Sequence, residues 1–367
     1  MVEIVTMTKR DIAVLGAGNM GTAVAEVLAR RGHRVWLWDY NPDTIEAIRR
    51  DGENKFLPGV KLSKRIVLEA SMGKAVEKVE LVVIACASPY VRTIVRHLTQ
   101  CLSPSPSLRP PSPTRGEGKS TQFPSPRGRG EGEGRRLVIA HIAKGLEPKI
   151  NLTMHEVVQS ELHGALRRSV VTISGPSIAK EMVAGVPTAV VAASQDRKAS
   201  EFVRDAFTSP TFKVACSSDF KGVSICGALK NVYAIALGMC DGMRLTFNAK
   251  SFMFTVALTE MECVAQSLGG KRDTVYGLAG VGDLVVTGLG DGRNRALGER
   301  ICKEGHCKFV WNKSAQTHEG VTATKVFYEF ARHKKITTPL LTVVYRVLYG
   351  GADPCKQIKH FFKTVAL

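Results

Sequence analysis

The sequence has no CxxC pair, no long hydrophobic run and few aromatic residues, which make up 7% of its 367 positions. Nine cysteines are scattered singly, which argues against a zinc ribbon or a thioredoxin-like motif. The residues nearest to a metal cluster are Cys302, His306, Cys307 and His318, and their spacing fits no standard zinc module. We therefore expect no metal site, and we expect the cysteines to be reduced thiols.

Long hydrophobic segments are also missing. The longest uncharged apolar run is about residues 81–91, far short of the roughly 20 residues that a membrane span needs. Residues 1–10 contain no apolar core of signal-peptide length. The sequence therefore predicts no membrane span, no secretion signal and a cytoplasmic location.

Acidic residues are scarce relative to basic ones, and the formal net charge is +18. Nucleic-acid-binding proteins are often basic, but they usually show a basic stripe with interleaved aromatics, which is not visible here. A positive field also concentrates anionic substrates around an enzyme. We favour a small phosphorylated substrate and expect no nucleic acid.

One segment, residues 103–136, differs from the rest of the chain. It holds seven of the 16 prolines and an imperfect repeat that relates residues 111–118 to residues 124–132. Such a composition buries too little apolar surface to offset its ordering entropy, so we predict an exposed, weakly ordered insert. An inserted spacer is favoured over a partner-binding arm. The insert has seven basic and three acidic residues, so most of the positive charge lies elsewhere.

Strands alternate with helices over the first part of the chain. This pattern predicts an α/β domain with a Rossmann-like, doubly wound and mostly parallel sheet over residues 1–215, interrupted by the insert. After about Cys216 the pattern is helical, which predicts an all-α carboxy-terminal domain over residues 216–367. The predicted strands are 11–15, 34–38, 81–85, 137–141, 170–173 and 188–192, and the predicted helices include 19–31, 43–50, 89–101, 222–240, 249–268 and 322–333.

A glycine fingerprint, GxGxxG, follows the first predicted strand and opens the first predicted helix. Gly16 permits a tight turn, Gly18 lets the backbone approach a pyrophosphate, and Gly21 allows close helix packing. The amino terminus of the helix supplies free N–H groups for the anion. The fingerprint in this context predicts a dinucleotide site.

Asp39 closes the second predicted strand, where an acidic residue suits the free ribose hydroxyls of NAD and repels a 2′-phosphate. A helix cap ahead of Pro42 is the alternative role for Asp39. We predict NAD as the cofactor and leave NADP possible, because Arg34 could meet a 2′-phosphate.

Two further motifs follow predicted strands, at the edge where open α/β sheets bind their ligands. Lys144 lies in the first, residues 143–147, and Gly175 and Ser177 lie in the second, residues 174–177. Each alone could be an ordinary loop. Together they predict one site.

Lys230 lies in an apolar, helix-like stretch, residues 223–237. From the neighbouring residues alone, the aliphatic part of Lys230 could lie on apolar surface while its ammonium group stays in water. If it is buried instead, its pKa falls toward the range useful for proton transfer. Gly-rich turns bearing Asp283, Arg293 and Asn294 follow, and they suit phosphate recognition unless they are simply solvated loops.

Taken together, these motifs resemble the soluble NAD(P)-dependent glycerol-3-phosphate dehydrogenase family, which interconverts dihydroxyacetone phosphate and sn-glycerol 3-phosphate. The resemblance covers nearly the whole chain except the insert. It rests on nine segments in order, namely 16–21, 54–59, 144–146, 174–181, 227–231, 248–250, 277–283, 292–294 and 319–321.

The resemblance implies a role for each matching residue. Lys230 corresponds to the catalytic proton donor and acceptor. The implied substrate-binding residues are Lys144, Gly175, Ser177, Lys230, Asn231, Asp283, Gly292, Arg293 and Asn294. The implied cofactor-binding residues are Gly16, Gly18, Asn19, Met20, Gly21, Asp39, Tyr40, Lys144, Ala179, Arg293 and Glu319. A role in glycerophospholipid synthesis and a homodimer are further expectations.

Three positions depart from the family pattern. Met20 replaces a usual Trp, which alters packing on the cofactor, and Tyr40 stands where NADP-using relatives often carry Arg. Val256 aligns with a usual Arg, so support for the substrate site is in question. Two alternatives therefore stay open: a related β-hydroxy-acid dehydrogenase, and a dinucleotide-binding protein that has lost catalysis.

Overall fold

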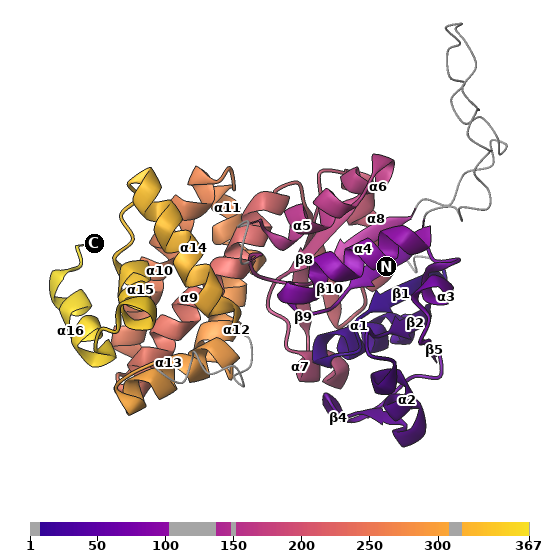
Figure 1. Ribbon diagram of the computed structural model, residues 1–367, viewed down its shortest axis with the longest axis horizontal. Helices are drawn as coiled ribbons and strands as arrows, with labels where there is room; N and C mark the ends of the chain where they lie inside the picture. Colours follow the sequence, from indigo (N-terminus) through magenta and orange to yellow (C-terminus); the bar gives the residue numbers. More distant parts are fainter. Residues whose placement is uncertain (1–7, 103–136, 148–151, 308–317, 367) are drawn as a thin grey trace, which may run out of the picture.

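A sheet domain and a helical domain lie side by side in the computed structural model (Figure 1). The structure describes residues 8–102, 137–147, 152–307 and 318–366. The predicted insert, residues 103–136, lies outside the described residues.

The first domain is built on a sheet of eight strands in the order β10-β9-β8-β7-β6-β1-β2-β5. All neighbouring pairs are parallel except β8 and β9, so the prediction of a mostly parallel, Rossmann-like sheet is confirmed. The strands are β1 (Asp11–Leu15), β2 (Arg34–Trp38), β5 (Ile66–Leu68), β6 (Leu81–Ile84), β7 (Val138–His141), β8 (Val170–Ser174), β9 (Thr188–Ala193) and β10 (Phe212–Ser217). A separate antiparallel pair joins β3 (Glu53–Asn54) to β4 (Leu57–Lys61).

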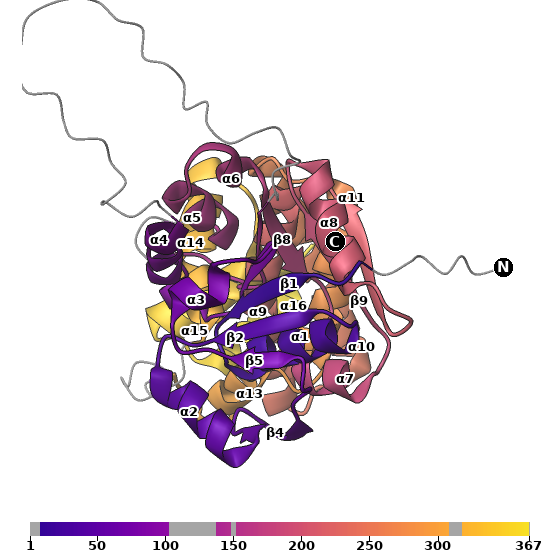
Figure 2. The same cartoon turned by 90° about the vertical axis from the view of Figure 1, so that its right-hand side faces the viewer.

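Helices cover both faces of the sheet (Figure 2). Successive residues of a strand point to opposite faces, so Ile12 and Val14 pack under one helical layer, and Ala13 and Leu15 under the other. The first layer includes α1 (Asn19–Arg30), α2 (Pro42–Asp51), α7 (Ala179–Ala184) and α8 (Arg197–Phe207). The second includes α3 (Met72–Val76), α4 (Val91–Leu102) and α5 (Met154–Glu161), with η1 (Ser88–Tyr90) leading into α4 and α6 (Gly164–Arg168) following α5.

The second domain is helical, as predicted, and within the described residues no strand follows Ser217. Its central helix is α9 (Phe220–Gly242), which packs against α10, α12, α13, α14 and α15. The other elements are α10 (Phe247–Ser267), α11 (Arg272–Val275), η3 (Leu278–Gly282), α12 (Asp283–Leu289), α13 (Arg293–Glu304), α14 (Glu319–Lys334), α15 (Pro339–Gly350) and α16 (Pro354–Thr364).

Helix α9 is long and apolar enough to cross a membrane, if length and composition alone are considered. Its most apolar window is entirely buried inside the protein. A helix that is apolar on every side is also what the centre of a large helical core requires. The structure therefore accounts for the composition of α9 by its place in the core.

Candidate active site

Lys230 lies on α9 and is buried, with 6% of its surface exposed. Its Nζ atom donates to Oδ1 of Asp283 at 2.6 Å and to Oγ1 of Thr287 at 2.7 Å. The interpretation that Lys230 reaches solvent is therefore wrong. Its ammonium group is tolerated inside the protein because a carboxylate and a hydroxyl accept its hydrogen bonds.

Lys144 approaches the same carboxylate from the sheet domain. It follows β7, and its Nζ atom donates to Oδ2 of Asp283 at 2.6 Å and to the Gly175 carbonyl at 3.1 Å. Ser174, the last residue of β8, lies 3.4 Å from the same Oδ2 atom. The two strand ends and two helices of the other domain thus meet at one buried Asp283 side chain.

Electrostatics at this cluster favour proton exchange on Lys230. Burial lowers the pKa of Lys230 to about 8; the negative charge of Asp283 opposes this shift and the positive charge of Lys144 adds to it. Burial would raise the pKa of Asp283, but the two ammonium groups outweigh it and hold that pKa below its usual value. The carboxylate therefore stays ionised while Lys230 can exchange a proton near neutral pH.

Close approach of the two domains depends on Gly227, one turn before Lys230. A Cβ atom at this position would lie 3.3 Å from Oγ of Ser174 and 3.6 Å from Cγ of Lys144. A larger side chain on this face of α9 would push the Lys144 loop away from the helix. The glycine thus lets both lysines reach one carboxylate.

An amide cluster extends the site along α9. Nδ2 of Asn294 donates to Oδ1 of Asn231 at 3.0 Å, and the Gly320 amide donates to Oδ1 of Asn294 at 3.3 Å. Asn231 and Asn294 are both buried. The sequence placed Asn294 in a Gly-rich turn, whereas the structure places it in the first turn of α13.

Arg293 opens α13 after Gly292 and is the exposed member of this group. Its side chain is 61% exposed, and its Nη2 atom lies 3.7 Å from Oε1 of Glu319, the first residue of α14. Such a long contact leaves most of the guanidinium donors available to an anion.

The glycine loop shows the geometry that its fingerprint predicts. Gly16 has φ +120°, and a Cβ atom there would lie 2.9 Å from the Ala85 carbonyl oxygen. A Cβ atom at Gly21 would lie 1.8 Å from the Gly16 carbonyl oxygen, so only glycine fits. At Gly18 a Cβ atom would meet nothing within 4 Å, so the loop backbone is open there.

The open side of this loop leads to the amino terminus of α1. Asn19 and Met20 are its first two residues, and the N-cap residue, Gly18, has no side chain to cap the helix. Met20 packs at the edge of the apolar layer beneath the sheet. The free N–H groups of this first turn suit the pyrophosphate of a dinucleotide.

Asp39 lies beside the glycine loop and holds it in place. Its Oδ2 atom accepts a hydrogen bond of 2.7 Å from the Ala17 amide, and its Oδ1 atom accepts one of 3.0 Å from Asn41. Tyr40, the next residue, is 67% exposed.

Arg34 lies at the other end of β2, level with Asp11. Its guanidinium stacks on Trp36, 4.7 Å from the ring centroid. The strand runs roughly 3.3 Å per residue, so Arg34 is far from Asp39 and cannot share its ligand. The expectation that Arg34 could meet a 2′-phosphate there is wrong.

Ser177 and Ala179 lie just beyond the lysine pair. Ser177 donates its hydroxyl to the Gly175 carbonyl at 3.0 Å, and Ala179 is the buried first residue of α7. The loop reaches the cluster through its backbone, because the Gly175 carbonyl accepts from Nζ of Lys144.

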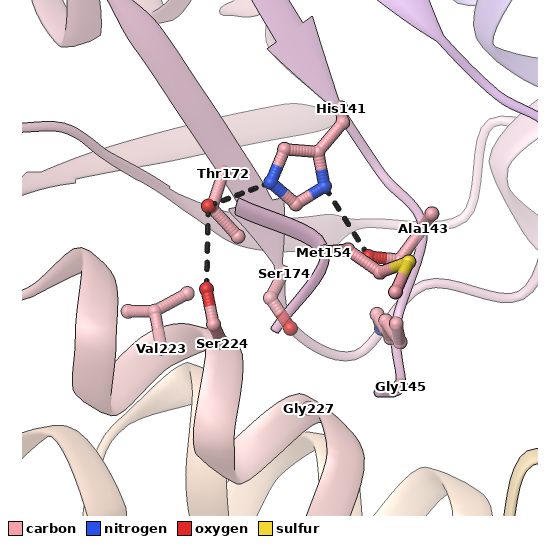
Figure 3. A pocket seen from close by; sticks show the side chains of 10 residues that line it. His141, Ala143, Gly145, Met154, Thr172, Ser174, Val223, Ser224 and Gly227 are labelled. Atoms are coloured by element: carbon pink, nitrogen blue, oxygen red, sulfur yellow. Dashed lines mark hydrogen bonds between the residues drawn. The ribbon is translucent and has the colours of Figure 1, made fainter. Parts of the chain in front are cut away.

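A small cavity of about 10 Å³, with room for roughly one water molecule, has Lys144 among its lining residues. Polar side chains from β7, β8 and α9 face it, as Figure 3 shows for His141, Thr172 and Ser224.

Comparison with known proteins accounts for this arrangement. The model of the NAD-dependent glycerol-3-phosphate dehydrogenase amino-terminal domain matches residues 11–109 and 133–200, and that of the carboxy-terminal domain matches residues 219–359. This chain belongs to that family. The amino-terminal match omits residues 110–132, which fall inside the predicted insert.

Individual relatives match along nearly the full length. Glycerol-3-phosphate dehydrogenase [NAD(P)+] of Moorella thermoacetica is 37% identical over 94% of this chain and 92% of its own. The protein of that name from Nitratidesulfovibrio vulgaris Hildenborough is 35% identical over 95% and 96%. The crystal structure of the Coxiella burnetii glycerol-3-phosphate dehydrogenase is 31% identical, with a TM-score of 0.81 over 97% of this chain and 99% of that one.

Sequence reasoning missed Thr287, which shares Lys230 with Asp283. The two residues are four apart on α12, so they lie on one face of that helix. The spacing was visible in the sequence, but the flanking glycines suggested a turn and hid the helix.

Val256, the departure that raised doubt about the substrate site, lies in the main apolar core of the helical domain. It is 7% exposed and packs among the apolar residues of that core.

The described residues contain no group of three or more His, Cys, Asp or Glu side chains able to hold a metal ion.

Proposed function

We propose that this chain catalyses the reversible reduction of dihydroxyacetone phosphate to sn-glycerol 3-phosphate with a nicotinamide dinucleotide. The observation that supports this most strongly is the buried Lys230–Asp283–Lys144 cluster at the carboxyl edge of a dinucleotide-binding sheet. The family to which the chain belongs contains relatives named for this activity.

Reduction of a ketone requires a hydride on carbon and a proton on oxygen. NAD(P)H supplies the hydride, and Lys230 donates the proton as negative charge develops on the oxygen. Asp283 holds the ammonium of Lys230 in place, and Lys144 adds a second positive charge beside the oxygen. In the reverse direction, the neutral amine of Lys230 accepts the alcohol proton.

We assign the substrate phosphate to the open end of the site. Arg293 presents a largely exposed guanidinium, whose planar fork of donors matches phosphate oxygens. Gly292, Asn231 and Asn294 shape this end, and Gly175 and Ser177 border the other end beside Lys144. A bound phosphate orients the carbonyl toward Lys230 as a remote handle.

The dinucleotide would lie along the glycine loop. Gly16, Gly18 and Gly21 with Asn19 and Met20 form the pyrophosphate cradle, and Asp39 and Tyr40 border the adenosine ribose. Lys144, Ala179, Arg293 and Glu319 lie toward the nicotinamide. We expect NAD to be preferred over NADP because a carboxylate at Asp39 repels a 2′-phosphate.

Three further expectations complete the proposal. Residues 1–215 would form the dinucleotide-binding domain and residues 216–367 the substrate domain. The enzyme would be a cytoplasmic homodimer, which light scattering on the purified protein would test. Its product would enter glycerophospholipid synthesis.

The decisive assay follows NADH and NADPH oxidation in parallel, with dihydroxyacetone phosphate and with a panel of keto acids. We expect turnover with the phosphorylated ketone and none with the keto acids. Turnover on a keto acid alone would instead support a β-hydroxy-acid dehydrogenase. NADH binding without any turnover would support a protein that has lost catalysis.

Replacing Lys230 tests the chemistry itself. Lys230→Ala should lower kcat by about 10²–10⁴-fold while NADH still binds, because loss of a positioned proton donor has this cost. Lys221→Ala, an exposed lysine on the same helix, is the matched control and should keep its activity. Near-normal turnover of Lys230→Ala would contradict the assignment.

A further inference from the structure

A chain of hydrogen bonds connects α9 to the Ala143 carbonyl, in the loop that carries Lys144 (Figure 3). Oγ of Ser224 lies 3.4 Å from Oγ1 of Thr172, which lies 2.9 Å from Nε2 of His141. Nδ1 of His141 lies 3.3 Å from the Ala143 carbonyl oxygen, one residue before Lys144. All three side chains are buried.

The partners determine the direction of these hydrogen bonds. A carbonyl oxygen only accepts, so the Nδ1 atom of His141 carries the proton and its Nε2 atom accepts from the Thr172 hydroxyl. A hydroxyl donates one hydrogen and accepts two, so Thr172 accepts from Ser224 and from Nδ1 of His155 at 2.8 Å. From Ser224 through Thr172 and His141, each donor therefore points from α9 toward the Ala143 carbonyl.

The three residues lie on α9, β8 and β7, close in sequence to three partners of Asp283, namely Lys230, Ser174 and Lys144. Ser224 is two turns before Lys230 on α9. Thr172 is two residues before Ser174 on β8, and His141 ends β7, three residues before Lys144. Each of these elements thus carries one residue of the hydrogen-bonded chain and, on the element or in the loop after it, one partner of Asp283.

His155 braces the chain from α5. Its ring stacks on Phe220 of α9, with 4.3 Å between the ring centroids. Among the residues that the structure describes, no group forms a hydrogen bond with its buried Nε2 atom. The network therefore links the first turns of α9 to the sheet through a ring contact and a hydroxyl.

We propose that His141, Thr172 and Ser224 are positioning residues, which set the placement of Lys144 relative to Lys230 by tying the Lys144 loop to α9. This inference rests on the proposed function, because it assumes that both lysines serve one substrate. The chain ends at a carbonyl oxygen, which has no proton to pass on, so it acts through geometry and not as a proton route.

The test compares Thr172→Val with Thr172→Ser in steady-state kinetics with dihydroxyacetone phosphate. Valine removes the hydroxyl and keeps the shape, so we expect kcat to fall about tenfold or more, as for small misplacements of reacting groups. The KM and dissociation constant for NADH should stay within about twofold, because the glycine loop is untouched. Serine keeps the hydroxyl and should restore most of kcat.

A second pair of variants, Ser224→Ala and Ser200→Ala, controls for a general loss of stability. Ser224→Ala should lower kcat in the same direction but by less, because its contact with Thr172 is long. Ser200→Ala removes another buried hydroxyl, which donates to the Arg197 carbonyl on α8, and should leave kcat unchanged.

Three results would overturn the inference: wild-type kcat in Thr172→Val, no recovery in Thr172→Ser, or an equal loss in Ser200→Ala. If Thr172→Val does not fold, the Ser224→Ala and Ser200→Ala pair decides. A wild-type enzyme that does not reduce dihydroxyacetone phosphate would refute the proposed function instead. An active wild type with unaltered variants would refute the positioning role alone.

Discussion

Asp283 is the residue on which the site depends, because each of its carboxylate oxygens accepts from a different ammonium group at 2.6 Å. A buried carboxylate with two cationic partners stays ionised. Its negative charge limits how far burial lowers the pKa of Lys230, which stays at about 8. Removing Asp283 would leave two like charges side by side without compensation.

The pH dependence of turnover should report Lys230. Proton donation requires the ammonium form, so kcat/KM for ketone reduction should be constant at low pH and fall as pH rises through about 8. Alcohol oxidation requires the neutral amine, so kcat/KM for that direction should rise as pH rises through about 8. Stopped assays across pH 6–10 in one mixed buffer would measure both, with the range chosen to lie about two units either side.

Asp283→Asn provides the comparison for that profile. Losing the carboxylate charge removes what favours the ammonium form, so the descending limb should move to lower pH. A limb that stays in place would mean that another group controls the profile.

Asp39 should control cofactor choice. Asp39→Asn removes the negative charge and retains an oxygen for the Ala17 amide, so discrimination against NADPH should weaken by about tenfold. The ratio of kcat/KM for NADH and NADPH measures this effect. Glu53→Gln, an exposed acidic residue outside the glycine loop, should leave the ratio unchanged.

At the scale of elements, the crossing of α9 and α13 brings Asn231 against Asn294. Two glycines permit it. A Cβ atom at Gly298 would lie 2.0 Å from the Ile235 carbonyl oxygen, and one at Gly238 would lie 1.9 Å from the Arg295 carbonyl oxygen. At these two positions the helices therefore approach backbone to backbone.

Gly298→Ala should accordingly destabilise the protein. The clash is with backbone, which cannot move as a side chain can, so the free energy of unfolding should fall by about 1–3 kcal/mol or more. Chemical denaturation measures this change. Gly350→Ala is the matched control, since its Cβ atom would meet only Cβ of Arg346, at 3.9 Å, and alanine favours helix. An equal effect of both substitutions would contradict the role of the α9–α13 crossing.

At the scale of the whole molecule, two apolar cores meet at a polar boundary. The helical domain packs around α9, and the sheet domain packs in two layers on its strands. The cluster around Asp283 lies where β7 and β8 end against α9 and α12. A site between two domains can bind the dinucleotide on one side and the substrate on the other.

The insert should be dispensable for this arrangement. Residues 110–132 fall outside the family match, which resumes on both sides of them. Replacing residues 110–132 by a short Gly-Ser linker should leave kcat and the melting temperature unchanged within error. The full-length chain is the control, and loss of turnover in the shortened chain would show that the insert contributes to the enzyme.

Local patterns predicted much of the fold. The first strand, the first helix and the second strand were predicted within one residue, because each combines a clear period with a glycine or charge boundary. Strand β10 was missed, since it is an edge strand in which only Phe212 and Val214 are buried. Helices α12 and α13 were missed because their glycines indicate turns until the packing against α9 is known.

The sequence by itself determined the glycine loop, the parallel sheet and the order of lysine-bearing motifs, because these depend on residues close together in the chain. Only the tertiary structure decided that Lys230 is buried, that Asp283 joins it to Lys144, and that Thr287 belongs to the site. The physical reason is distance along the chain. Lys144 and Asp283 are 139 residues apart, and only the packing of α9 and α12 against the ends of β7 and β8 brings them to 2.6 Å.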